Sequence, residues 1–506
     1  MQQAVSEKNL EQVTLFIAGE NRNSSKGETF QVINPATKQA VANVASGTED
    51  DVKAAIDAAY EAFPKWSQTT APERAEILFK VGQLIQENKE ELAKTITIEE
   101  GKALNEARAE VKQAYNTAMY FAGEGRRMLS NVTPSETKDK LTMTIRRPLG
   151  VAAIITPWNF PIMIPFWNLS PALVCGNTVV FKPASFTPIT ASRIVELFVK
   201  AGLPKGVLNV ITGPGARVGK VLVESDKIRV CAFTGESQTG KDIAQTSMKY
   251  LRKQVLELGG KNPLIVASDA DLAIAVGGAL WSAFSNAGQK CTAASRIIVE
   301  ESILDSFTNK FVEATRRLHV GNGLDSSTEI GPLISEGALA KTQEYVAIGI
   351  KEGAKLLAGG EDYKDAKDLR EDLQKGNFHP PTVFSGTNDM KISQDEIFGP
   401  ITTIIPVRNI SEAIETANDT RYGLASAIYT KDFRNVMRAA YEIDAGVTFL
   451  NQGPVGIEVG ASFGGVKDSG FGRELGEVGI EDYTEKKTLY LDYSNQVQPF
   501  FYPWKR

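Results

Sequence analysis

The segment VAAIITPWNFP, residues 151–161, decides the fold, because it joins a wholly apolar run to a loop that two prolines fix. Its first part, Val151–Ile155, has the length and β-branched composition of a buried strand. Strand and helix candidates then alternate along the chain: Asn177–Phe181, Ile189–Ala201, Val207–Ile211, Arg217–Val223 and Arg229–Phe233. This alternation predicts right-handed βαβ units around a parallel sheet.

A second α/β stretch extends from Leu264 to about Ile443. It contains the apolar helix candidate Leu272–Phe284 and the strand candidates Arg296–Val299 and Thr402–Val407. A chain of 506 residues is also too long for a single hydrophobic core. We therefore expect an α/β protein of two or three domains.

Two further strand candidates stand apart from these stretches. Leu141–Arg146 follows the polar link Ser130–Lys140, and Thr488–Tyr493 lies near the end of the chain. Isolated strands need a partner for stability, so we expect these two to pair into a small projecting sheet. Such a sheet favours assembly with other copies of the chain.

Composition excludes several classes of function. The formal net charge of −5 lacks the basic excess of a nucleic-acid-binding protein. No apolar run reaches the length of a membrane-spanning helix, and Met1–Asn9 lacks the apolar core of a secretory signal. The three cysteines form no C-x-x-C pair, which is typical of reduced thiols. We expect a cytoplasmic protein that binds neither nucleic acid nor membrane.

A thiol is the leading nucleophile candidate, because two histidines leave little for a metal site or a Ser-His-Asp triad. Cys291 lies in a loop of small residues, where Gly288 permits close backbone approach and Lys290 favours the thiolate electrostatically. The alternative is a buried structural thiol. Cys175 and Cys231 lie in apolar contexts and are predicted to belong to the core.

Glu257 is a candidate general base. It lies between two leucines, ahead of the pair Gly259 and Gly260, and burial there would raise its pKa. A surface carboxylate at a strand end is the alternative. Asn159, in the proline-fixed loop, can present an amide N–H to a developing oxyanion, or it can simply cap the turn.

Two glycine clusters each follow a strand candidate and open a helix. They span residues 213–219 and 235–240, and neither has the spacing G-x-G-x-x-G. Both suit a dinucleotide that lies over helix N-termini at the carboxyl edge of a parallel sheet. Each could also be an ordinary turn.

Together these segments resemble the aldehyde dehydrogenase superfamily over nearly the whole chain, from Ile33 to Gly470. Its motifs occur here in the family's order: Pro157-Trp-Asn-Phe-Pro161, Phe181-Lys-Pro-Ala184, Phe233-Thr-Gly235, Leu256-Glu-Leu-Gly-Gly260, Gly288-Gln-Lys-Cys291 and Glu396-Ile-Phe-Gly-Pro400. The resemblance implies an NAD(P)-dependent enzyme of the hydrolytic type and no metal.

The resemblance also implies residue roles. Cys291 would attack the aldehyde, Asn159 and the Cys291 backbone N–H would hold the oxyanion, and Glu257 would activate water. Fifteen residues would contact the cofactor: Ile155, Thr156, Pro157, Trp158, Lys182, Ser185, Gly215, Gly219, Phe233, Gly235, Glu236, Gly240, Leu258, Glu396 and Phe398.

Two departures from the family pattern bear on the choice between NAD and NADP. Ser185 stands where NAD-preferring relatives often carry a glutamate for the ribose hydroxyls, which leaves Lys182 available for a 2′-phosphate. Glu236 stands where relatives commonly have a small hydroxyl residue near the diphosphate, and its charge would oppose phosphate unless it caps the helix. We expect NADP.

The family fold comprises a Rossmann-like parallel-sheet cofactor domain, an α/β catalytic domain and a small β oligomerisation flap. In this chain they are expected at residues 1–129 and 150–258, at 259–470, and at 130–149 and 486–506, respectively. The resemblance further implies a homodimer or homotetramer. The aromatic tail Gln498–Trp504 would cover a neighbouring subunit's tunnel or pack on its surface.

The aldehyde itself is expected to be a dicarboxylic semialdehyde such as α-ketoglutaric semialdehyde, since the pattern is similar to bacterial enzymes of that type. Arg147 and the segment 160–167 are expected to line the substrate tunnel. A broad-specificity or aromatic aldehyde dehydrogenase is the alternative. A CoA-acylating relative is a further one, although such enzymes generally lack the glutamate at the position of Glu257.

Overall fold

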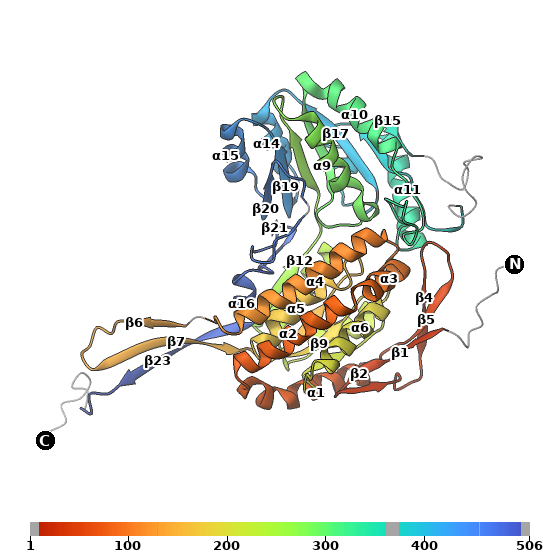
Figure 1. The fold of residues 1–506 in the computed structure, drawn as a ribbon. Coiled ribbons are helices and arrows are strands. Elements are labelled where there is room, and N and C mark those ends of the chain that lie inside the picture. Colours follow the sequence, from red (N-terminus) through yellow and green to blue (C-terminus); the bar gives the residue numbers. More distant parts are fainter. Residues whose placement is uncertain (1–9, 129, 361–373, 455, 497–506) are drawn as a thin grey trace.

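The protein, described here by a computed structural model, has two α/β lobes and a β ribbon that projects from one of them (Figure 1). Residues 10–128, 130–360, 374–454 and 456–496 are described. The first lobe contains a mixed eight-stranded sheet, and the second contains a seven-stranded sheet. The α/β fold class expected from the alternation of strands and helices is confirmed.

The eight-stranded sheet has the order β22-β12-β11-β8-β9-β10-β2-β3. Its middle strands, β12 to β10 in that order, are parallel. The chain runs from β8 outward to β9 and β10, and then returns to place β11 and β12 on the other side of β8. A reversal of this kind leaves a crevice at the carboxyl ends of β8 and β11, the Rossmann-like arrangement. The strands are β2 (Leu15–Ile17), β3 (Glu20–Arg22), β8 (Val151–Ile155), β9 (Thr178–Lys182), β10 (Leu208–Val210), β11 (Ile228–Thr234), β12 (Lys253–Glu257) and β22 (Gly470–Phe471).

Both faces of this sheet are buried, which explains the continuous apolar run in β8. Ala152 and Ile154 face one core, and Val151, Ala153 and Ile155 face another. The first core also contains residues of several helices labelled in Figure 1, among them α2 (Ala71–Glu87), α4 (Leu104–Glu124), α5 (Met163–Val174) and α6 (Pro188–Lys200). The second contains residues of α1 (Glu49–Gln68), α7 (Lys220–Glu224) and α8 (Ser237–Met248). Cys175 lies in the first core and Cys231 in the second, as predicted.

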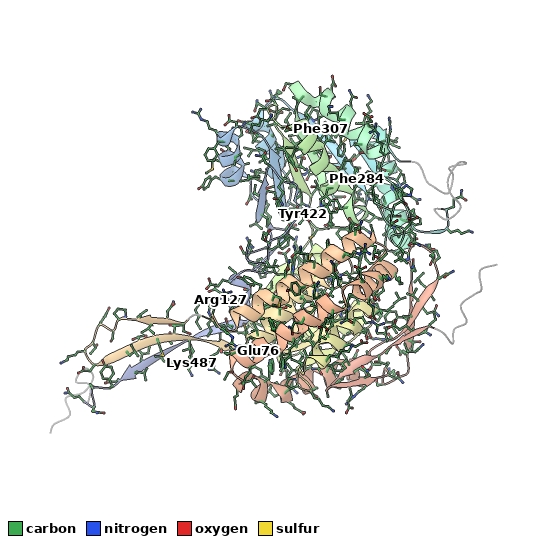
Figure 2. The ribbon with its side chains drawn as sticks, viewed as in Figure 1. Glu76, Arg127, Phe284, Phe307, Tyr422 and Lys487 are labelled. Carbon is green, nitrogen blue, oxygen red and sulfur yellow. The ribbon has the colours of Figure 1, made fainter. Side chains whose placement is uncertain are left out.

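The seven-stranded sheet forms the second lobe, with Phe284 and Phe307 in its core (Figure 2). Its strands are β15 (Lys355–Ala358), β16 (Thr382–Ser385), β17 (Ile401–Val407), β14 (Ala294–Glu300), β13 (Asn262–Val266), β19 (Ala425–Tyr429) and β20 (Val447–Leu450), in spatial order. All neighbours are parallel except β15 and β16. The helix predicted over Leu272–Phe284 is α9, with the same bounds.

The remaining helices are mostly on the second lobe: α3 (Lys89–Glu100), α10 (Leu304–Arg316), α11 (Glu336–Lys351), α13 (Lys391–Gln394), α14 (Ile410–Asn418), α15 (Phe433–Glu442) and α16 (Val478–Asp482). Of these, α3 lies beside α4, and α16 packs against α5 and β12, both in the first lobe. Among the remaining strands, β1 (Glu11–Val13), β4 (Thr29–Ile33) and β5 (Ala40–Ala45) form a separate sheet, and β18 (Tyr422–Gly423) pairs with β21 (Val466–Lys467).

The projecting ribbon confirms the predicted pairing of two distant strands. β7 (Lys140–Pro148) runs antiparallel to β23 (Thr484–Asp492) over nine residue pairs. The polar link before β7 also contains a short strand, β6 (Asn131–Thr133), which the sequence analysis did not expect. The domain boundaries stay a prediction, and the aromatic tail from Gln498 lies outside the described residues.

Candidate active site

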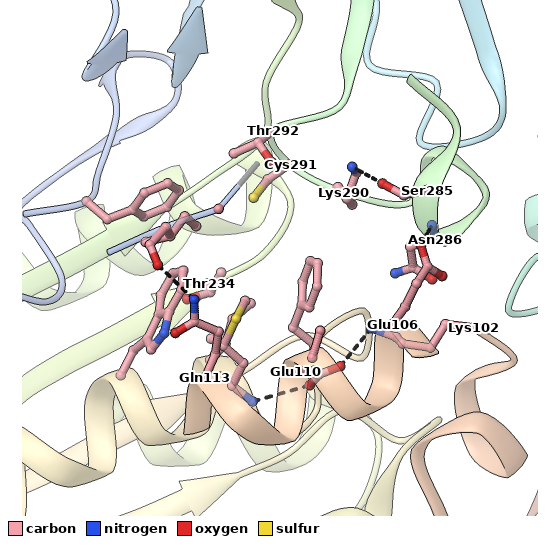
Figure 3. A pocket seen from close by; sticks show the side chains of 18 of the residues that line it. Lys102, Glu106, Glu110, Gln113, Thr234, Ser285, Asn286, Lys290, Cys291 and Thr292 are labelled. Atoms are coloured by element: carbon pink, nitrogen blue, oxygen red, sulfur yellow. Dashed lines mark hydrogen bonds and ion pairs between the residues drawn. The ribbon is translucent and has the colours of Figure 1, made fainter. Parts of the chain in front are cut away.

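A cavity of about 310 Å³ lies between the two lobes, and we call it the substrate cavity (Figure 3). Its walls come from α4, the segment that opens α5, the carboxyl ends of β11 and β12, and the loop after α9. The residues that line it are Lys102, Glu106, Ala109, Glu110, Gln113, Phe160, Met163, Ile164, Trp167, Thr234, Glu257, Trp281, Ser285, Asn286, Lys290, Cys291, Thr292, Gly456, Ile457 and Phe463. The cavity therefore brings together Cys291 and Glu257, which are 34 positions apart in the sequence.

Glu257 is buried, so the surface alternative is wrong. It is the last residue of β12, opposite Thr234 at the end of β11. Within the described residues, neither carboxylate oxygen has a hydrogen-bond partner of ordinary geometry. Burial, together with the charge of Glu474, raises the pKa of Glu257 well above the usual range of a glutamate. The raised pKa makes the carboxylate form of Glu257 a stronger base than an ordinary glutamate.

Cys291 is the partly exposed cysteine of the three, whereas Cys175 and Cys231 are buried. The backbone of this loop is fixed from the second sheet, because the Asn262 side-chain amide donates to the Cys291 carbonyl at 2.7 Å. Gly288 adopts a φ of 70°, and a Cβ there would lie 2.2 Å from the Gly399 carbonyl oxygen. The small residues around the thiol are therefore required by close packing.

The attraction between Lys290 and a Cys291 thiolate that the sequence suggested is present, because the charge at Cys291 raises the pKa of Lys290, but burial outweighs it at both groups. The Lys290 ammonium donates to the Ser285 hydroxyl and to the Trp281 carbonyl. Burial lowers the pKa of Lys290 to about 8. Burial, together with the nearby carboxylates of Glu257 and Glu396, instead raises the pKa of the Cys291 thiol. These surroundings favour the neutral thiol over the thiolate.

Asn159 lies behind the wall of the substrate cavity and is buried. One N–H of its side-chain amide donates to the Gln289 carbonyl at 3.0 Å, which ties it to the loop of Cys291. Its backbone carbonyl accepts from the Lys102 ammonium at 2.6 Å and from the Asn286 amide at 3.2 Å. The turn-capping alternative is therefore inadequate, because Asn159 connects both lobes.

A second cavity of about 690 Å³ lies at the carboxyl edge of the eight-stranded sheet, and we call it the cofactor groove. It occupies the crevice that the strand order predicts, outside β8 and β11. Ten of the predicted cofactor residues line it: Ile155, Thr156, Pro157, Trp158, Lys182, Gly215, Gly219, Phe233, Gly235 and Glu236. Thr234 lines both this groove and the substrate cavity.

Lys182 lines the groove, and Ser185 follows it three positions later in the sequence. Lys182 ends β9 and donates to the Pro183 carbonyl at 3.0 Å. Burial lowers the pKa of Lys182 to about 8. The Ser185 hydroxyl donates to the Gly213 carbonyl at 3.0 Å, and Ser185 itself is not among the residues that line the groove.

Glu236 caps α8. The sequence had left open whether its charge would oppose a cofactor phosphate or cap this helix. Its carboxylate accepts from the backbone N–H groups of Gln238 and Thr239. Burial alone would raise the pKa of Glu236, but these hydrogen bonds and the one from the Thr239 hydroxyl lower it overall. The charge is therefore held at the positive end of the helix.

Four further predicted cofactor residues lie beside the groove without lining it. Glu396 accepts from the Gly260 backbone N–H at 3.0 Å, and the Phe398 ring packs edge-on against Trp158 with centroids 5.6 Å apart. Gly240 makes room for Leu258, because a Cβ at Gly240 would lie 2.3 Å from the Leu258 side chain. From the second lobe, Phe398 thus contacts a residue that lines the groove.

Several residues of the site were missed by the sequence analysis. Glu474 is buried, accepts from the Asn168 amide at 2.7 Å, and has a pKa raised to about 7 by burial. No local pattern marks it, because its neighbours are distant in sequence. Lys102, Glu106 and Glu110 could have been found from their spacing of four residues.

Arg147 was wrongly expected in the substrate tunnel. It lies on β7 of the projecting ribbon, opposite Glu485, and does not line the substrate cavity. Phe160, Met163 and Trp167 do line it, as expected. Across the described part of the chain, there is no group of three or more potential metal ligands and no helix long and apolar enough to cross a membrane.

One cavity contains a cysteine and a glutamate, and Thr234 connects it to a groove over the edge of a Rossmann-like sheet. This combination is typical of an oxidoreductase that uses a nicotinamide dinucleotide. The sequence profile of the aldehyde dehydrogenase family matches residues 22–489. The chain belongs to the aldehyde dehydrogenase family.

Two relatives from Bacillus subtilis (strain 168) illustrate the similarity. A betaine aldehyde dehydrogenase is 43% identical over 481 residues, which are 94% of this chain and 97% of the relative. An α-ketoglutaric semialdehyde dehydrogenase is 42% identical over 479 residues, with the same coverage. The crystal structure of betaine aldehyde dehydrogenase from Staphylococcus aureus in complex with NAD+ superposes with a TM-score of 0.93, at 37% identity and 98% coverage of both chains.

Proposed function

We propose that this aldehyde dehydrogenase converts an aldehyde and water into a carboxylic acid through a covalent intermediate on Cys291. The Cys291 sulfur adds to the carbonyl carbon and loses its proton, and the oxyanion that forms is held by the Asn159 side chain and the Cys291 backbone N–H. Nicotinamide, when bound, accepts the hydride from that carbon. A thioester on Cys291 remains.

Glu257 completes the cycle by hydrolysis. Its carboxylate takes a proton from water, the water oxygen attacks the thioester carbon, and the Cys291 thiolate leaves and regains a proton. The observation that carries this proposal is the substrate cavity itself, where Cys291 and an unpartnered, buried Glu257 share one wall with Thr234. A CoA-acylating function, the other candidate, does not need a general base here.

Two classes of aldehyde are supported by different observations. α-Ketoglutaric semialdehyde, our expectation from the sequence, is supported by the 42% identity to a relative of that name. A neutral or aromatic aldehyde is supported by the cavity wall, where Phe160, Trp167 and Trp281 provide apolar surface. The two lining lysines are already bonded, Lys102 to Glu110 and Lys290 to Ser285. The geometry thus favours the neutral or aromatic class.

NADP is the proposed cofactor, as the sequence suggested. Ser185 brings no negative charge to the ribose end of the groove, and Lys182 lines the groove with no carboxylate in contact among the residues described. A 2′-phosphate would pair with that ammonium. NAD is the alternative, and the similar Staphylococcus aureus enzyme was crystallised with it.

We also propose the three-domain division given above and a homodimer or homotetramer held by the projecting ribbon. The ribbon's outward strand β23 leaves Tyr490 82% exposed, which favours burial against another copy. A cytoplasmic location agrees with the reduced cysteines proposed here.

The test is reduction of the cofactor, followed at 340 nm, with purified protein, NAD and NADP in parallel, and an aldehyde panel. The panel contains α-ketoglutaric and succinic semialdehydes, betaine aldehyde and benzaldehyde. Turnover that requires CoA would exclude the hydrolytic function. A kcat/KM at least tenfold higher for α-ketoglutaric semialdehyde than for benzaldehyde would overturn the preference drawn from the cavity wall.

A further inference from the structure

One face at the start of α4 carries three ionisable residues at intervals of four: Lys102, which precedes the helix, and Glu106 and Glu110 within it. In Figure 3 these side chains point from that helix toward the substrate cavity, across from Asn286 and Cys291. We call them the α4 triad. Lys102 and Glu110 are buried, and burying an ion pair is costly unless its hydrogen bonds are satisfied.

Glu110 binds the start of α5. One of its carboxylate oxygens accepts from the backbone N–H groups of Ile162 at 3.0 Å and Met163 at 3.2 Å. The N-cap position of α5, Ile162, makes no side-chain capping bond of its own, so Glu110 supplies the missing acceptor from another helix. The other oxygen pairs with the Lys102 ammonium at 2.8 Å.

Lys102 binds the loop just before α5. Its ammonium donates to the Asn159 carbonyl at 2.6 Å and lies 4.2 Å from the centre of the Phe160 ring. Burial would lower the pKa of Lys102, but the carboxylates of Glu100 and Glu110 raise it overall, so the ammonium stays charged. The pair thus holds the polypeptide on both sides of Pro161.

The backbone of Lys102 is itself fixed by the second lobe. A Cβ at Gly323 would lie 2.2 Å from the Lys102 carbonyl oxygen, and one at Gly331 would lie 2.1 Å from the Gly101 carbonyl oxygen. The Leu104 N–H also donates to the Gly323 carbonyl at 2.9 Å. Lys102 is therefore a rigid attachment point.

Glu106 extends the same arrangement to the nucleophile's loop, because its carboxylate accepts from the Asn286 backbone N–H at 2.9 Å. Asn286 has a positive φ of 52°, and its side chain donates to the Asn159 carbonyl. The loop of Asn159 and the loop of Cys291 are thus both held by one helical face.

We propose that Lys102 and Glu110 are positioning residues for the reaction, which set the Asn159 amide so that one N–H stays on Gln289 and the other is directed to the oxyanion. This inference rests on the proposed role of Asn159. Neither residue takes part in proton or hydride transfer. A shift of about 1 Å in such a donor costs about 10²-fold in rate.

The experiment compares Lys102→Met, Asn159→Ala and the double variant. We expect Lys102→Met to lower kcat about 10- to 100-fold with the cofactor KM unchanged. In the double variant the loss should equal that of Asn159→Ala alone, because Lys102 acts through Asn159. Lys102→Arg should recover part of the rate, and Arg108→Gln, which removes an exposed ion pair on the outer side of α4, should be neutral.

A second readout separates positioning from general damage to the fold. Alkylation of Cys291 by iodoacetamide forms no oxyanion, so its rate in Lys102→Met should match the parent. A fall in alkylation that parallels kcat would overturn the proposal, as would losses that multiply in the double variant. If Lys102→Met fails to fold, Lys102→Met/Glu110→Gln removes both buried charges and is measured in its place. Full activity of Asn159→Ala would instead refute the oxyanion role and leave the α4 triad without its target.

Discussion

Glu257 of the substrate cavity and Glu236 of the cofactor groove are both glutamates, but their surroundings shift their pKa values in opposite directions. In the substrate cavity, burial and Glu474 raise the pKa of Glu257, and within the described residues no ordinary hydrogen bond satisfies its oxygens. In the cofactor groove, hydrogen bonds from α8 lower the pKa of Glu236 despite its partial burial. The comparison teaches that burial without hydrogen bonds raises the pKa of a glutamate, as suits the general base proposed at Glu257, whereas hydrogen bonds at a helix N-terminus keep Glu236 charged.

The largest effect should come from the nucleophile. Cys291→Ala should reduce aldehyde-dependent cofactor reduction by about 10³-fold or more, because no other group in the cavity can form the thioester. Cys175→Ala is the matched control, since that thiol is buried in the core. It should keep kcat while losing about 1 kcal/mol of unfolding free energy. Steady-state rates at 340 nm check the activity of both variants, and urea unfolding checks the stability of Cys175→Ala. An active Cys291→Ala variant would refute the assignment of Cys291 as the nucleophile.

The general base should give the next effect. Glu257→Gln should lower kcat by about 10²- to 10⁴-fold. Because the pKa of Glu257 is raised, its carboxylate form becomes abundant only as the pH rises, so kcat of the parent should increase with pH. That increase should vanish in the variant. A pH profile of kcat tests this, and an unchanged rising limb in Glu257→Gln would assign it to another group.

Cofactor choice should respond to the ribose end of the groove. Ser185→Glu should lower kcat/KM for NADP about 10²-fold, since a carboxylate would repel the 2′-phosphate, and should spare or improve NAD. The pKa of Lys182, lowered to about 8 by burial, adds a pH dependence. Above that pH the ammonium loses its charge, so kcat/KM for NADP should fall while that for NAD stays level. Equal pH profiles for the two cofactors would contradict pairing with Lys182.

The smallest effect should come from the capping glutamate. Glu236→Ala should cost about 1 kcal/mol of unfolding free energy, the usual value of an N-cap. Because the folded-state pKa of Glu236 is lowered, this contribution is present above the pKa of the unfolded state and is lost as the pH falls through the folded-state value.

Asp271→Ala is the matched control, because it removes the N-cap of α9 in the second lobe. Both variants should lose similar stability in urea unfolding. Only Glu236→Ala should lower the KM for the dinucleotide, because it removes negative charge beside the groove. A higher KM for the dinucleotide in Glu236→Ala would mean that Glu236 contributes to binding directly.

Local patterns in the sequence were sufficient for much of the fold and of the cofactor groove. β8 and α9 have the predicted bounds, because each is a continuous apolar run with clear ends. The glycine cluster that begins at Gly235 was found because it follows directly on a strand, β11, whereas other groove residues, such as Thr156 after β8, were expected from the family resemblance. Topology then places them at one edge.

The substrate cavity was harder to predict, because its groups meet only through the packing of the two lobes. The contact of Lys102 with the Asn159 carbonyl joins residues 57 positions apart, and Glu474 bonds to a residue 306 positions away. The protonation of the thiol was hard to predict for the same reason: burial and the carboxylates of Glu257 and Glu396, which raise the pKa of Cys291, come from distant parts of the sequence, whereas Lys290 is adjacent.

The most direct measurement is rapid mixing of Glu257→Gln with NAD(P)+ and an aldehyde that the parent oxidises, followed by mass spectrometry of the quenched protein. If Cys291 carries the thioester and Glu257 hydrolyses it, absorbance at 340 nm should rise in a burst equal to the enzyme concentration and then nearly stop. The peptide that contains Cys291 should gain the mass of the acyl group. Absence of the burst, or an acyl group on Cys175 or Cys231, would contradict the mechanism.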